Sequence, residues 1–218
     1  MSGFCGFTGN RYHSEDNAVI RRMMERIKHR GHVEQGMHAD EHNISIGAQF
    51  SGAFDLHYSE SRSVILVLDG QIYEQSEPLI RLYEEHGEDM ARHLRGMFAF
   101  LIYDSEKEQI FAARDSFGIK PFYYAVIEGE FVFASEIKSL LDYPGFRKEL
   151  NQEALEQYLS FQYSVLPETF FKGVFKLPPA HSLTFKDGSV TLKKYWDGTF
   201  TPDESLTLDA CVDERHSP

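Results

Sequence analysis

Four short segments rich in β-forming residues follow one another through the middle third of this chain. They cover residues 97–103, 109–113, 122–126 and 131–134, and short polar turns at 105–107 and 128–129 lie within the first and second pairs. Connections this short join antiparallel neighbours, because a parallel pair needs a crossover of a dozen or more residues. The pattern therefore predicts an antiparallel sheet in this part of the chain.

Further strands are predicted on both sides of this region. Residues 3–8 form an apolar run, residues 44–50 alternate apolar and polar side chains as a half-buried strand does, and residues 64–68 are almost continuously apolar. Asp187-Gly188 lies between two β-rich stretches, which is a strong signal for a hairpin. Strand and helix signals alternate along the chain in the way that two sheets between helical layers would require.

Helical spacing of apolar residues predicts helices between the strands. The first covers about residues 14–31 and the second about 76–87, with Pro78 in its first turn. Ser14 and Ser76 stand where N-caps are expected, and Gly31 and Gly87 where the helices end. Two more helices are predicted at 136–141 and 152–159, the latter capped by Asn151.

Composition narrows the class of protein. A chain of 218 residues with 42% hydrophobic residues can bury a core as one globular domain. The net charge of −12 argues against nucleic acid as a partner, because binding to phosphates depends on Lys and Arg. No apolar run approaches the ~20 residues that span a bilayer, and the two cysteines suggest no disulfide framework, so the cytoplasm is the expected location.

Four blocks of sequence carry a resemblance to a known family. They are GMFAFLIYD (96–104), ARDSFGIKPFYY (113–124), FASEIKSLL (133–141) and KLPPAHSL (176–183), and a fifth, LVLDGQIYE, occupies 66–74. In this order they resemble the class-II glutamine amidotransferase half of glutamine-dependent asparagine synthetase, an enzyme of asparagine biosynthesis. The resemblance extends from Ser2 to about Trp196. It implies an α+β fold: an Ntn-hydrolase-like four-layer αββα sandwich of two mostly antiparallel sheets.

The N-terminus of the chain departs from the family at its nucleophile. The family begins Met-Cys-Gly, loses the Met and uses the Cys thiolate with its own free amine as base, whereas this chain has Ser2 at that position. Cys5 lies inside an apolar run and is expected to be a small buried hydrophobe rather than a nucleophile. A serine hydroxyl is a much poorer nucleophile than a thiolate near neutral pH, so a large loss of rate is expected.

The segment that stabilises the oxyanion has also changed. In the family an Asn side chain and the following Gly N–H donate to the developing negative charge, and the corresponding residues here are Asp69 and Gly70. An ionised Asp accepts hydrogen bonds and donates none. Loss of one oxyanion donor costs about 2.7–4 kcal/mol, and only the Gly70 half of the pair is retained.

Three substrate-anchoring positions differ as well. By the same resemblance, Phe50 replaces the Arg that holds the glutamine α-carboxylate, while Gln71 and Gln75 replace the acidic residues that hold the α-amino group. Each charge-assisted hydrogen bond is worth about 1.5–3 kcal/mol, so these changes remove most of the affinity for a zwitterionic amino acid. The connection between the two acidic positions is about twenty residues shorter than in the family.

Two polar segments remain to be assigned. The stretch HRGHVEQG (29–36) replaces the family's H-R-G-P-D loop, and with His38 and His42 it gathers four histidines, but their spacing matches no metal motif and we predict a solvated helix end and loop. Arg114 and Asp115 are predicted to support the fold rather than act in catalysis, and the aromatic residues of 117–124 to belong to the core. No metal and no cofactor are implied.

Residues 1–195 are therefore expected to form a type-2 glutamine amidotransferase-like domain, and residues 196–218 a polar tail without the synthetase domain. Three hypotheses follow: a catalytically impaired domain, or pseudoenzyme, retained for docking or regulation; a slow Ser2-dependent amidohydrolase acting on a neutral amide; or a fragment of a full synthetase. The partners expected are a synthetase-like protein or a second copy of the chain, and neither nucleic acid nor a membrane.

Overall fold

The computed structural model describes residues 2–9, 16–31, 34–39, 44–50, 56–73, 78–163 and 167–199. Its described strands form two six-stranded sheets in which every paired neighbour is antiparallel. The first sheet has the order β10-β8-β9-β1-β3-β2 and the second β12-β11-β7-β6-β5-β4. The strands are Gly3–Thr8 (β1), Glu34–Ala39 (β2), Ile44–Phe50 (β3), His57–Tyr58 (β4), Val64–Ile72 (β5), Gly96–Asp104 (β6), Gln109–Arg114 (β7), Tyr123–Ile127 (β8), Glu130–Ala134 (β9), Val174–Lys176 (β10), His181–Lys186 (β11) and Ser189–Lys194 (β12).

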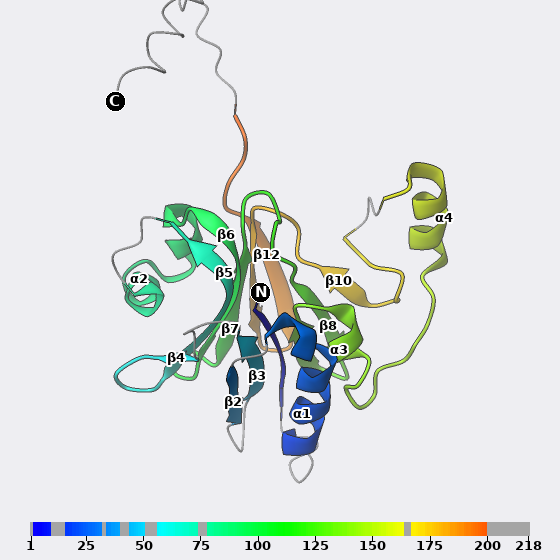
Figure 1. Cartoon of the computed structure of the whole chain (residues 1–218). Helices are drawn as coiled ribbons and strands as arrows, with labels where there is room; N and C mark the ends of the chain where they lie inside the picture. Colours follow the sequence, from blue (N-terminus) through cyan, green and yellow to red (C-terminus); the bar gives the residue numbers. More distant parts are fainter. Residues whose placement is uncertain are drawn as a thin grey trace, which may run out of the picture.

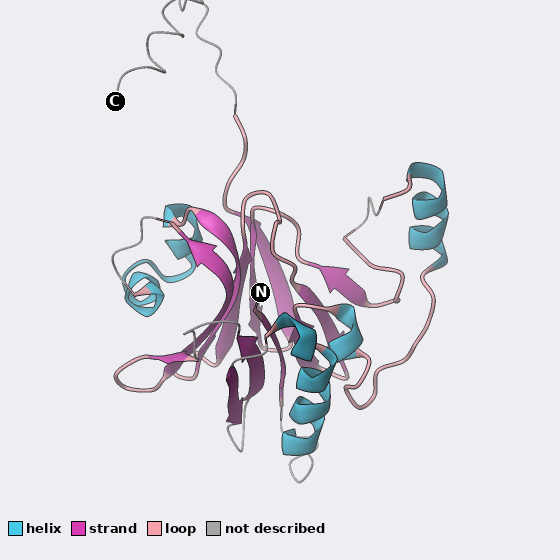
Figure 2. Cartoon of the chain, in the orientation of Figure 1, coloured by secondary structure: helices cyan, strands magenta, loops and turns pink. Residues whose placement is uncertain are grey.

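The described helices are α1 (Asp16–Arg26), α2 (Leu79–His86), α3 (Ile137–Leu140) and α4 (Gln152–Phe161), with 3-10 helices η1 (Lys28–Arg30) and η2 (Gly87–His93). The helices α1 and α3 lie on the outer face of the first sheet and α2 on that of the second, whereas α4 projects away from both (Figures 1 and 2). One apolar cluster fills the space between the sheets, a second lies between β5–β7 and α2–η2, and a third between β1 and α1–α3. This is the predicted four-layer αββα arrangement.

Most of the predicted elements are present, and their ends are set by the expected residues. Asp187 and Gly188 have φ values of +50° and +72° between β11 and β12, as a two-residue type I′ hairpin requires. The Asn151 side chain caps α4 by accepting a hydrogen bond from the Ala154 N–H at 3.1 Å. Gly87 ends α2 with a positive φ of +57°. Ser14 and Ser76 lie outside the described residues.

Other predictions were wrong in part. The strand β3 is buried on both faces rather than half-buried, because the polar side of the strand packs under α1 while Ile44, Ile46 and Ala48 face the other sheet. The helix α1 ends at Arg26 instead of Gly31. The segment predicted to be a solvated helix end and loop contains η1 and then the strand β2, which pairs with β3 along its whole length.

The aromatic run at 117–124 divides between core and surface. Phe122 and Tyr124 are buried as predicted, whereas Phe117 is 75% exposed and its ring lies 5.5 Å from that of Trp196. Phe117 is exposed because it sits at the tip of a loop whose backbone is held from inside by Asp115. Tyr195 is buried, and its hydroxyl donates to the Arg114 carbonyl at 2.6 Å, so the end of the described chain is fixed to the second sheet.

Candidate functional site

The expected nucleophile lies at the start of β1, where one arginine holds its backbone. Arg30 Nε donates to the Ser2 carbonyl at 2.8 Å. The Arg30 side chain passes over Gly3 on its way to the Ser2 carbonyl, and a Cβ added to Gly3 would lie only 2.7 Å from Arg30 Cδ. Gly3 is therefore required for this close approach of a side chain to the strand, which explains why the sequence places a glycine directly after the nucleophile position.

The Asp69 carboxylate is the centre of a buried charge cluster beside Ser2. Asp69 is fully buried near the end of β5, and its Oδ2 accepts a hydrogen bond from Arg30 Nη2 at 2.7 Å. Lys120 Nζ lies 3.4 Å from Oδ1, an ion-pair distance, while Oδ1 accepts no hydrogen bond from the described residues. The predicted oxyanion position is thus occupied by a carboxylate that two cations hold in place.

Glu136 extends this cluster toward the surface. Its Oε1 accepts from Arg30 Nη1 at 3.1 Å and lies 2.7 Å from His29 Nε2, and its Oε2 lies 3.0 Å from Lys138 Nζ. Burial raises the pKa of Glu136, but the hydrogen bonds from Lys138, Arg30 and His29 lower it by more, so the pKa lies below its ordinary value. Arg30 therefore joins the Ser2 backbone to two carboxylates.

A rigid loop between β7 and β8 delivers Lys120 to the cluster. The Asp115 carboxylate accepts from the backbone N–H groups of Phe117, Ile119 and Lys120, at 3.1, 2.9 and 3.0 Å. Arg114 donates to the carbonyls of Lys120 at 2.6 Å, Leu177 at 2.8 Å and Gly118. These contacts agree with the predicted structural role of the Arg-Asp pair, although the two side chains bind the backbone instead of each other.

The second residue of the predicted oxyanion pair keeps an unusual backbone. Gly70 has a φ of +128°, and a Cβ there would lie 1.9 Å from the Met97 carbonyl oxygen. It stands opposite Phe98, whose N–H and C=O both pair with Asp115 on the far side of β6. Because the backbone groups of Phe98 are used on that side, Phe98 and Gly70 form a non-hydrogen-bonded pair of the β5–β6 ladder. The Gly70 N–H is therefore directed away from β6.

The predicted anchoring residues are not gathered around Ser2 in the same way. Phe50 is 2% exposed and packs in the core between the sheets, on the face opposite its neighbour Gln49. Gln71 is exposed near the end of β5 and lines a cavity formed with α2. Gln75 lies outside the described residues. Neither described position presents a charged group to an amino acid.

Other candidate groups give no second reactive centre in the part of the chain that the structure describes. Burial raises the pKa of the Cys5 thiol far above its usual range, as expected for a buried hydrophobe. No group of three or more metal-binding side chains is found there, and His32 and His42 lie outside it. No helix among the described residues is long and apolar enough to cross a membrane.

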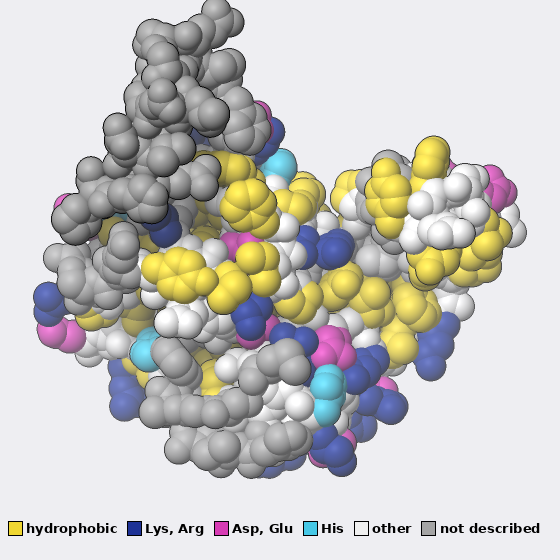
Figure 3. Space-filling view, turned by 45° about the horizontal axis from the view of Figure 1, so that its top comes forward, with side chains coloured by type: hydrophobic (Ala, Val, Ile, Leu, Met, Phe, Trp, Pro, Cys, Tyr) yellow, Lys and Arg dark blue, Asp and Glu magenta, His cyan; other side chains and the backbone are white. Residues whose placement is uncertain are grey.

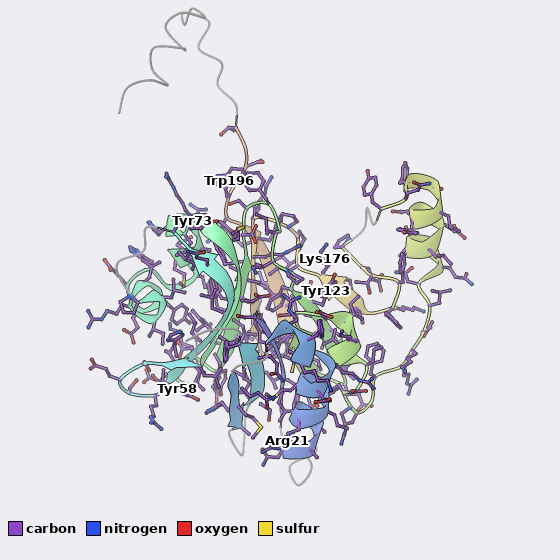
Figure 4. All side chains as sticks on the ribbon, in the orientation of Figure 1. Arg21, Tyr58, Tyr73, Tyr123, Lys176 and Trp196 are labelled. Atoms are coloured by element: carbon purple, nitrogen blue, oxygen red, sulfur yellow. The ribbon has the colours of Figure 1, made fainter. Side chains whose placement is uncertain are left out.

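Sequence reasoning missed the cations of the site. Arg30 and Lys120 were each part of a recognised block, at 29–36 and 113–124, but nothing local shows that these two segments meet at Asp69. Glu136, in the block at 133–141, joins the cluster through Arg30. Tyr123 and Lys176, neighbours across β8 and β10, lie on the same side of the molecule (Figure 4). Both side chains are partly buried, and this burial raises the pKa of Tyr123 and lowers that of Lys176.

Two stacked antiparallel sheets between helical layers, with the N-terminal strand inside one sheet, define an Ntn-hydrolase-like fold. Glutamine phosphoribosylpyrophosphate amidotransferase from B. subtilis has the same fold, with a TM-score of 0.59 at 15% identity over 90% of this chain and 50% of that one. Residues 74–196 match the family described as glutamine amidotransferase domain. The chain belongs to this family.

Curated relatives cover nearly the whole chain. It is 34% identical to asparagine synthetase [glutamine-hydrolyzing] 1 of Bacillus subtilis, over 91% of this chain and 36% of that protein. It is 30% identical to the amidase chyE of Penicillium rubens, over 90% of this chain and 32% of that protein. The chain therefore spans about a third of the length of these relatives.

Proposed function

We propose that this chain is a glutamine amidotransferase domain of the asparagine synthetase type in which glutamine hydrolysis is impaired, and which is retained for docking or regulation. The observation that carries the proposal is the buried Asp69 carboxylate, 2.7 Å from Arg30, at the position where the resembling enzymes have an oxyanion donor. An ionised carboxylate repels a developing oxyanion and offers it no hydrogen bond.

The other changes act in the same direction. Ser2 supplies a hydroxyl in place of a thiolate, and Phe50 places an aromatic ring in the core where an arginine would hold the substrate carboxylate. Gln71 is neutral, so it does not bind a substrate ammonium group as a carboxylate does. Because each change affects the same bound transition state, repairing one leaves the others limiting.

Covalent labelling tests the proposal directly. The protein is incubated with an electrophilic glutamine analogue such as 6-diazo-5-oxo-norleucine, and its intact mass is measured with and without the reagent. We expect no added mass on Ser2. Rapid stoichiometric labelling that is lost in Ser2→Ala would contradict impairment, since it would require both a reactive N-terminus and a working glutamine pocket. The same spectrum reports whether Met1 is removed.

The alternative is a slow Ser2-dependent amidohydrolase that acts on a neutral amide. It is supported by the retained backbone of the site, with the Ser2 carbonyl held by Arg30 and the Gly70 N–H directed away from β6, and by the amidase names of two relatives. A panel of uncharged primary amides, assayed for ammonia release, tests it. Activity that Ser2→Ala abolishes, and that glutamine does not compete for, would favour this alternative.

Retention for docking is supported by an apolar surface. The helix α4 stands away from the sheets (Figure 1) and only Ala154 of it is buried. Large exposed hydrophobic residues gather on and around it, as Figure 3 shows for the projecting helix. They include Tyr158, Leu159, Phe161 and Tyr163, which are 41–71% exposed. Patches of this kind usually mark interaction sites.

We propose a synthetase-like polypeptide as the occupant of this surface, because the relatives are about three times as long as the chain and the surface is continuous with the domain that they share. Light scattering after size exclusion, alone and with a separately expressed synthetase-like protein, tests the partner. A complex that Leu159→Lys weakens supports the proposal. Self-association through the same residue, or no complex at all, would contradict the choice of partner.

A further inference from the structure

A cavity of about 830 Å³ opens on the outer face of the second sheet, between β4, β5 and α2. Leu66, Leu68 and Ile72 of β5 form its floor, and the first turns of α2 form one wall. Residues 57–61 form the other wall. The volume falls within the range of about 300–1,000 Å³ that is typical of small-molecule sites in proteins.

The floor of the cavity lies on the other face of β5 from Asp69, and Gln71 is the one predicted anchoring residue, among those that the structure describes, that also lines the cavity. Leu66 and Leu68 belong to the apolar cluster beneath α2, whereas Ile65 and Val67 face the core between the sheets. Alternation along β5 places Asp69 on the inner side with Ile65 and Val67. A ligand in the cavity would therefore lie on the opposite face of β5 from the charge cluster. Figure 4 shows Tyr58, on the cavity wall, at the other side of the molecule from Lys176.

The wall at residues 57–61 is held in position by contacts with other parts of the fold. Ser59 exchanges backbone and side-chain hydrogen bonds with Val64 at 3.0 and 3.1 Å. The Tyr58 ring lies 5.8 Å from the ring of His38 and 5.7 Å from the Arg62 guanidinium carbon. A wall supported in this way is formed before a ligand arrives, which lowers the entropic cost of binding.

The rim of the cavity is weakly acidic. Glu60 lies in the wall at residues 57–61, Glu84 and Arg81 lie on α2, and all three are exposed. Within the described residues, none of the three takes part in an ion pair. Two carboxylates against one guanidinium, in a chain with a net charge of −12, favour a positively charged group over a negatively charged one at this opening.

We propose that this cavity binds a small molecule that combines an apolar body with one ammonium or other cationic group. The apolar body would lie on Leu66, Leu68 and Ile72, and the cationic group between Glu60 and Glu84 at the rim. None of Leu66, Glu60 and Glu84 has a role in the proposed Ser2 chemistry, so this proposal holds whether or not Ser2 is reactive.

Three probes with the same body and different head groups test the proposal: 4-phenylbutylamine, 4-phenylbutan-1-ol and 4-phenylbutyrate. Each is titrated into labelled full chain while backbone amide shifts are followed by NMR. We expect saturable shifts at residues 57–61 and 78–84. The amine should bind about two- to fivefold more tightly than the alcohol, as expected for an exposed ion pair, and the carboxylate more weakly than either.

Two variants locate the binding energy. The double variant Glu60→Gln, Glu84→Gln should lower the affinity for the amine to that for the alcohol. The matched control is Glu153→Gln on α4, which should leave the affinity for the amine unchanged. Leu79→Trp, at the edge of the cavity, should weaken all three probes, with a thermal melt to confirm folding. No saturable shifts for any probe, shifts confined to other parts of the chain, or a carboxylate that binds as tightly as the amine would overturn the proposal.

Discussion

Removing one partner of the buried Arg30–Asp69 pair should destabilise the fold far more than removing one partner of a surface ion pair. Asp69 is fully buried and the Arg30 side chain is 11% exposed, so replacing Asp69 with Asn leaves Arg30 without its most buried counter-charge. Removal of one partner of a buried pair costs about 3–5 kcal/mol. Glu136 still accepts from Arg30 at 3.1 Å, which places the expected loss near the lower end, about 3 kcal/mol.

The matched control is an exposed pair in the same chain. Lys172 Nζ lies 2.7 Å from Glu149 Oε1, the two side chains are 63% and 59% exposed, and Glu149→Gln should leave the free energy of unfolding almost unchanged. Urea unfolding followed by circular dichroism measures both variants, and a thermal melt should show a decrease of about 6–12 °C for Asp69→Asn. Equal losses for Asp69→Asn and Glu149→Gln would refute the central role given to the buried cluster.

Three further results are expected. Ser2→Cys alone should leave ammonia release from glutamine at background. The triple variant Ser2→Cys, Asp69→Asn and Phe50→Arg should restore a trace of activity. Robust activity of Ser2→Cys alone would show that the substrate-anchoring residues are wrongly assigned. The fold lowers the pKa of Glu136, so the contribution of its ionised form to stability is fully present above the ordinary Glu pKa of 4.5. That contribution is lost as the pH falls through the lower pKa of the folded state. Glu136→Gln should therefore make the free energy of unfolding depend less on pH in the acid range. Gly3→Ala should destabilise the fold by about 1–3 kcal/mol, because its Cβ would displace Arg30, and a value near zero would remove the packing argument.

The elements that could be predicted are those whose signal is local. The Asp187-Gly188 turn specifies its hairpin because both residues readily adopt positive φ. Asn151 specifies the start of α4 because its side chain accepts a hydrogen bond from the N–H of Ala154, three residues further along the chain. The strand β2 was missed because its sequence, EQGMHA, has neither apolar alternation nor β-branched residues, and its pairing with β3 comes from the tertiary structure.

The sequence predicted which positions belong to the candidate site but not the contacts that their side chains make. Resemblance assigned Ser2 and Asp69, but the cations at Asp69 come from residues 39 positions before it, on η1, and 51 positions after it, in the β7–β8 loop. Such contacts depend on how the two sheets stack, which no local pattern encodes. Phe117 shows the same limit: its residue type favours burial, but the hydrogen bonds of its loop turn the ring outward.

Ammonia release from millimolar glutamine tests the impairment of the site most directly. The wild-type chain, with Met1 removal confirmed by mass, is assayed beside Ser2→Ala in the same buffer. A rate indistinguishable from that of Ser2→Ala is predicted, because Asp69 offers the oxyanion a paired negative charge and no donor. A Ser2-dependent turnover within the ordinary enzyme range of about 1–10³ s⁻¹ would contradict it.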